Sequence, residues 1–270
     1  MNKLVVPVGI LQYMLSDYRT RGPVFELYLN LKFYYGPFFK IEAKDIRFLQ
    51  RTLGYKSKRS ITNNLNNLLE INWLGFDSNR ELYAQRGVDY LCSVARVEYR
   101  VSVELWHQDL KTVKAFCAGA CIGLLSYKNF TNRKNNPQER FIKLMREGLK
   151  LRSLSQNLPL DELIPSKALK LNREKYWPVA SKSVASCLGI SISNARSLKQ
   201  LAAEYSYIFL ESLEVVLDEE SNQIALHQKY GSPNSEALRA KSGKVCIDLP
   251  DLVKAGIRYR SRKHGNFKTH

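Results

Sequence analysis

Two stretches of the chain concentrate side chains that can bind the phosphates and base edges of nucleic acid. The first carries basic, hydroxyl and amide groups, namely Lys56, Lys58, Arg59, Ser60, Asn63, Asn64 and Asn67. The second has the same mixture, namely Ser191, Ser193, Asn194, Arg196, Ser197, Lys199 and Gln200. Arginine pairs bidentately with guanine, asparagine and glutamine pair with adenine, and lysine and serine suit phosphate oxygens. We expect both stretches to contact DNA if helices present them outward.

Apolar residues at helical spacing predict such helices in the first half of the chain. Glu42–Leu53 forms one helix that ends at Gly54, because glycine readily adopts the positive φ that closes a helix. Ser57–Leu74 forms the next, with an apolar face made of Ile61, Leu65, Leu68 and Leu69. The other elements expected in this half are an extended segment over 1–15, a helix over 27–35, a turn over 75–80, strands over 81–85 and 94–105, and a buried helix over 109–127.

The second half repeats this order. Ser181–Leu188 is a short helix that ends at Gly189, and Ser193–Tyr205 is the next, capped by Ser191 or Ser193. Its inward residues are Ala195, Leu198, Leu201 and Ala202. Two strands then form a hairpin, over 207–217 and 223–229.

These patterns resemble the helix-turn-helix superfamily. The second half fits its skeleton without gaps, through Ala185, Leu188, Gly189, Ser191, Ala195, Leu198 and Leu201. The first half fits with a turn about two residues longer, and Trp73-Leu74-Gly75 resembles the way winged-helix domains enter the wing. The resemblance implies an α+β fold, mainly α with small β-hairpin wings, built as two tandem winged helix-turn-helix domains. Plasmid replication initiators are similar in this architecture.

The repeated order predicts an N-terminal winged-helix domain over 1–130, a basic linker and connecting helix over 131–155, and a C-terminal winged-helix domain over 156–270. The last domain ends in a basic tail without apolar periodicity, which we expect to supply charge without fixed geometry. Its DNA-binding residues are Arg258, Arg260, Arg262 and Lys263.

Charge favours a polyanionic partner. The 270 residues include 42 Lys and Arg against 25 Asp and Glu, a net charge of +17, and the 44% apolar content excludes a wholly disordered chain. We therefore expect a sequence-specific double-stranded DNA-binding protein, either a transcriptional regulator or a replication initiator, with a homodimer as an option. The alternative is a winged-helix protein-interaction module that touches nucleic acid unspecifically through its basic tail.

Catalytic and cofactor motifs are missing from the sequence. It holds no phosphate-binding glycine loop, no Gly-x-Ser-x-Gly elbow and no paired-histidine metal motif. Glu42-Ala43-Lys44 imitates the end of a nuclease metal site without a partner carboxylate, and Cys117 and Cys121 are read as buried helix thiols. We expect no enzyme activity, no metal and no cofactor.

Cysteine usage and hydropathy indicate the compartment. Five scattered cysteines indicate free thiols in a reducing compartment, and no run of about 18 to 20 uninterrupted apolar residues predicts a membrane span. The expected location is cytoplasmic, and nucleoid-associated in a bacterium.

One aromatic cluster either packs in the core, which we favour, or stacks single-stranded bases; it comprises Phe33, Tyr34, Tyr35, Phe38 and Phe39.

Overall fold

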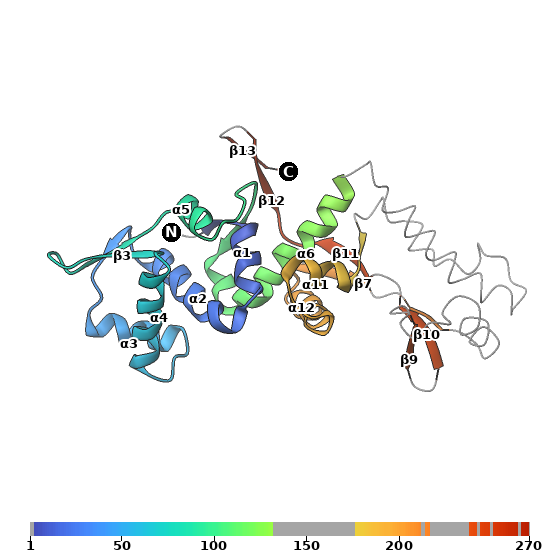
Figure 1. Ribbon diagram of the computed structural model, residues 1–270, viewed down its shortest axis with the longest axis horizontal. Helices are drawn as coiled ribbons and strands as arrows, with labels where there is room; N and C mark the ends of the chain where they lie inside the picture. The colour runs from blue at the N-terminus through green and yellow to red at the C-terminus, as the bar shows by residue number, and fades with distance from the viewer. Residues whose placement is uncertain are drawn as a thin grey trace, which may run out of the picture. The chain divides into compact units, whose positions relative to one another are not determined.

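The computed structural model belongs to the α+β class, with helices predominating over small antiparallel sheets (Figure 1). It describes residues 3–131, 176–211, 214–216, 238–241, 244–248, 251–263 and 266–269. Contacts divide the chain into two compact units. The first comprises residues 1–121, 188–190 and 257–270, and the second comprises 122–187 and 191–256. The expected linker from residue 132 onward, and the expected strand over 223–229, lie outside the described residues.

A four-stranded sheet in the first unit joins the two ends of the sequence. Its order is β1 (Lys3–Pro7), β5 (Val101–Trp106), β12 (Tyr259–Lys263) and β13 (Asn266–Thr269), and every pair is antiparallel. The expectation of a basic tail without fixed geometry is therefore wrong for β12. Tyr259 is buried there and donates its hydroxyl to the carbonyl of Ala120, which holds the strand in place.

The helices of this unit begin earlier in the sequence than expected. The extended segment predicted over 1–15 stops at Pro7, where β1 ends. Helix α1 (Val8–Leu15) follows, and its apolar side chains are buried in the core. Next comes α2 (Tyr18–Tyr34), nine residues before the predicted start at Leu27. The strand predicted over 94–105 is wrong in its first part. There α5 (Val88–Val94) ends and Arg96 turns the chain with a φ of +52°.

A short 3₁₀ helix, η1 (His107–Thr112), leads into the long apolar helix α6 (Val113–Thr131). Residues 107–127 reach the length and composition of a membrane span, with a mean hydropathy of 1.2, but most of this segment is buried within the protein. Cys117 and Cys121 are buried free thiols, as predicted, and burial raises the pKa of Cys117 well above its usual value. The environment of α6 is that of a core helix.

One arrangement of strands and helices occurs in the first unit. Strand β2 (Phe38–Phe39) precedes α3 (Ala43–Thr52) and α4 (Lys58–Glu70), and the hairpin β3 (Leu74–Asp77) and β4 (Leu82–Gln85) follows. Strand β4, the last of the three in sequence, lies between β2 and β3, so the sheet order is β2-β4-β3. The predicted pair of helices and the returning strand over 81–85 are confirmed.

The second unit contains the same arrangement. Strand β6 (Trp177–Val179) precedes α11 (Ser181–Leu188) and α12 (Ile192–Glu204), and β7 (Ile208–Glu211) follows. The returning strand comes much later in the sequence, as β11 (Asp251–Ala255), and the sheet order is β6-β11-β7. A separate sheet has the order β8-β10-β9, over Glu214–Val216, Lys244–Asp248 and Leu238–Lys241.

Candidate nucleic-acid interface

The two helix pairs turn in the same way. After α3, Gly54 has a φ of +64°, and after α11, Gly189 has a φ of +66°, a region that favours glycine. The next helix then begins on a serine cap. The Ser57 hydroxyl accepts the amide of Ser60 at 3.3 Å, and the Ser191 hydroxyl accepts the amide of Asn194 at 3.2 Å. Of the two serines proposed from the sequence, Ser191 is therefore the cap.

The two helices also end in the same way. Asn72 and Ser206 adopt φ values of +57° and +58°. The amide after each, that of Trp73 or Tyr207, returns to a carbonyl five residues earlier, at 2.8 Å and 3.0 Å. Residues 57–77 thus correspond one to one with residues 191–211, and both helices have 13 residues. This correspondence makes the two faces directly comparable.

The outward face of α4 keeps most of its predicted residues and loses one. Lys56, Lys58, Arg59, Asn63 and Asn67 are exposed. Ser60 is half-buried beside the helix cap. The outward position predicted for Asn64 is wrong, because the side chain is half-buried and its amide donates to the Tyr55 hydroxyl at 2.5 Å.

Two further residues, Thr62 and Asn66, are exposed on this face and were not among the binding residues predicted from the sequence. Asn66 lies three residues after Asn63, so helical spacing was the signal that would have found it.

The outward face of α12 also loses one predicted residue. The exposed members are Ser191, Ser193, Asn194, Arg196, Ser197 and Gln200. Lys199 was predicted to face outward and is only 1% exposed. Its ammonium donates to the Asp251 carboxylate at 2.7 Å and to the carbonyl of Val179. Burial lowers the pKa of Lys199, and the Asp251 carboxylate opposes that shift.

Lys199 falls inward because it lies four residues after Ala195 and three before Ala202, both of which are buried. It corresponds to Leu65 in α4, which is also buried.

The C-terminal basic residues are not equivalent to one another. Arg258 is exposed. Arg260 forms an ion pair with Glu104, which also binds Lys3 at 2.7 Å, so this arginine joins β12 to β5. The hydrogen bond from Lys3, together with the charge of Arg260, lowers the pKa of Glu104. Arg262 and Lys263 lie in β12, and their side chains are outside the described part of the structure.

The aromatic cluster divides between core and surface. Phe33 and Phe39 are buried, which confirms core packing for these two. Phe39 stacks on Tyr83 with ring centres 5.6 Å apart, and Phe76 lies 4.9 Å from the same ring. Phe38 is 68% exposed on the other face of this sheet, so core packing is wrong for Phe38.

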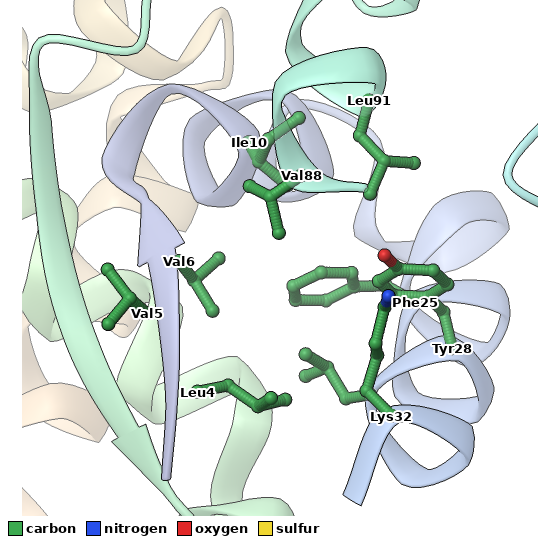
Figure 2. Close-up of a pocket in the computed structure, with 10 residues that line it drawn as sticks. Leu4, Val5, Val6, Ile10, Phe25, Tyr28, Lys32, Val88 and Leu91 are labelled. Carbon is green, nitrogen blue, oxygen red and sulfur yellow. The ribbon is translucent and has the colours of Figure 1, made fainter. Parts of the chain in front are cut away.

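A cavity of about 30 Å³ in the first unit is too small for a ligand, since ligand pockets have volumes of roughly 300–1,000 Å³. Figure 2 shows its walls, where Leu4, Val6 and Val88 face Phe25. Lys32 lies at its edge, 5.5 Å from the centre of the Tyr28 ring, and burial lowers the pKa of Lys32. Its apolar walls mark a packing gap in the core.

No group of three or more His, Cys, Asp or Glu side chains among the described residues is arranged to hold a metal ion. No protein-family model, curated protein or solved structure matches this chain.

Proposed function

We propose that this chain is a sequence-specific double-stranded DNA-binding protein, either a transcriptional regulator or a replication initiator of the cytoplasm. Its two repeated arrangements are winged helix-turn-helix domains, with α4 and α12 as the reading helices. One observation carries the proposal: the same turn, serine cap, 13-residue helix and three-stranded sheet occur twice, each with a polar outward face. Plasmid replication initiators are the architectural relatives we propose.

Strand order supports the winged-helix assignment. In both units a strand precedes the helix pair, and the last strand returns between the first strand and the one after the second helix. The backbone amide that follows each returning strand closes the motif. Arg86 donates to the carbonyl of Trp73 at 3.1 Å, and Gly256 donates to that of Tyr207 at 3.0 Å.

Electrostatics supports DNA as the partner of α4. Lys56, Lys58 and Arg59 are exposed around the N-terminal end of the helix, where unpaired backbone amides also favour an anion. The β3–β4 wing is close to neutral by comparison, because Asp77 approaches Arg80 at 4.0 Å and Glu81 approaches Lys40 at 3.9 Å. Phosphate binding in this unit is therefore assigned to the start of α4.

A protein-interaction module is the second candidate. Phe38 and Phe76 favour it, because both are large exposed aromatic side chains on the three-stranded sheet β2-β4-β3. They are 68% and 50% exposed. Such a module would bind DNA without sequence preference.

A salt titration of the full chain on duplex DNA tests the proposal. Roughly six phosphate contacts give a log–log slope near −5, so affinity falls about a thousandfold between 50 and 200 mM salt. Selection from random duplexes should enrich a defined motif. A flat salt response, or selection without a motif, contradicts the proposal and favours the protein-interaction module.

A further inference from the structure

The outward face of α4 is dominated by amides. Asn63, Asn66 and Asn67 are exposed. Asn63 and Asn66 follow Arg59 by four and seven residues, so Arg59, Asn63 and Asn66 lie along one stripe of the helix. The buried residues Ile61, Leu65 and Leu68 occupy the opposite side. Within the described part of the chain, no hydrogen bond is formed by the three amide side chains. They are available to a ligand that lies along the helix.

The corresponding face of α12 has different chemistry. Ser197 corresponds to Asn63, Gln200 to Asn66, and Leu201 to Asn67. Arg196 stands where α4 has Thr62. The α12 face thus combines one guanidinium with one longer amide, whereas the α4 face repeats the same short amide three times.

Amide chemistry selects among the partners that DNA offers. An asparagine side chain has both a donor and an acceptor, and the major-groove edge of adenine presents the complementary pair, the N6 amino group and N7. A phosphate offers acceptors only, so the amide oxygen would gain nothing there. Asparagine also carries no charge, so it adds nothing to the salt-dependent affinity.

The spacing of the amides sets the length of the sequence they can read. Asn63 and Asn67 are four residues apart, which is about 6 Å along a helix that rises roughly 1.5 Å per residue. Base pairs are spaced at about 3.4 Å, so this interval covers about two base steps.

We propose, resting on the proposed function, that α4 is an adenine reader. Asn63, Asn66 and Asn67 bind the major-groove edges of a run of two to three adenines. Helix α12 reads a different half-site through Arg196 and Gln200. The full DNA site is therefore composite, with two unlike halves.

Selection from random duplexes compares three forms of the full chain. The wild type should enrich a motif that contains an adenine run. The variant Asn63→Ala/Asn66→Ala/Asn67→Ala should lose that run and keep the rest of the motif. The matched control, Arg196→Ala/Gln200→Ala, should keep the run and lose the other half. Alanine is the best helix former, so both variants retain their helices, which circular dichroism checks.

A modified base then separates groove contacts from DNA shape. Replacing each adenine of the run by 7-deazaadenine removes N7 and leaves base pairing and the minor groove intact. Wild-type affinity should fall about tenfold or more per replaced adenine, and the triple-asparagine variant should show no further loss.

The outcomes distinguish the two proposals. If the wild type enriches a motif that lacks an adenine run, or if the triple variant keeps the run, the adenine reader is wrong and the DNA-binding proposal stands. An unchanged affinity for 7-deazaadenine duplexes has the same meaning. If the wild type enriches no motif at all, both proposals are wrong.

Discussion

Helices α4 and α12 have the same length, cap and ending, yet they are anchored by opposite means. At one buried position α4 has Leu65, which packs as an apolar side chain. At the corresponding position α12 has Lys199, bound to Asp251 at the start of β11 and to the carbonyl at the end of β6. Apolar contact tolerates small shifts of a helix, whereas a buried ion pair requires its partner at a fixed place. The comparison teaches that equal geometry does not mean equal sensitivity to substitution.

The largest expected effect comes from breaking the buried pair on one side. Asp251→Ala leaves the Lys199 ammonium buried without its carboxylate and should lower the free energy of unfolding by about 3–5 kcal/mol. Lys199→Leu places at this position the leucine that α4 has at Leu65, and it should change the free energy of unfolding little. Denaturant unfolding combined with hydrogen exchange in α12 measures both variants. Equal losses for the two substitutions would show that the ion pair itself, and not the unpaired charge, determines stability.

An intermediate effect is expected at the two turns. Gly54→Ala and Gly189→Ala should each destabilise by about 1–2 kcal/mol, because an L-residue is strained at their positive φ. A β-carbon at either position meets no atom within 4 Å, so the backbone alone sets this loss and the two values should agree. Gly36→Ala is the control, because this site is also open and its φ is not positive. Unfolding followed by hydrogen exchange in α4 and α12 supplies the values; a clear inequality would mean that the turns are not equivalent.

The smallest effect concerns pH and the strand β12. The partners Lys3 and Arg260 lower the pKa of Glu104 in the folded state, so its contribution is present above the usual glutamate range and is lost as pH falls through the lowered pKa. Glu104→Gln should remove this acid-dependent part, at most about 1 kcal/mol for a partly exposed pair. Unfolding curves of both proteins between pH 7 and pH 3 should therefore converge at the acid end. Curves that stay parallel would show that the charge of Glu104 does not hold β12.

Signals confined to a few neighbouring residues predicted the two turns and the helices that follow them. Gly54, Gly189 and Ser191 act locally through φ or through a bond to the next turn, so the sequence alone indicated where α4 and α12 begin. Lys199 was misplaced although helical spacing puts it on the buried side of α12, because Asp251, the carboxylate that partners its charge there, lies 52 residues later in the sequence. Asn64 failed for a similar reason, since Tyr55 lies outside the helix and accepts its amide.

The four-stranded sheet β1-β5-β12-β13 of the first unit was the least predictable part. Strand β12 has alternating basic residues and no apolar pattern, and its pairing with β5 brings together residues about 160 positions apart. Tyr259 was the one side chain that could have indicated burial. The helix pairs α3–α4 and α11–α12, by contrast, are built from neighbours in sequence.

The pairing of β5 with β12 has a consequence for how the protein is made. The first unit binds its last strands only after the whole second unit has been synthesised, so this sheet closes late and across a very long loop. Until then β5 has an open edge, which other chains can pair with. A fragment that stops at residue 130 would keep that edge permanently. Slow closure of the first unit follows from the position of one strand.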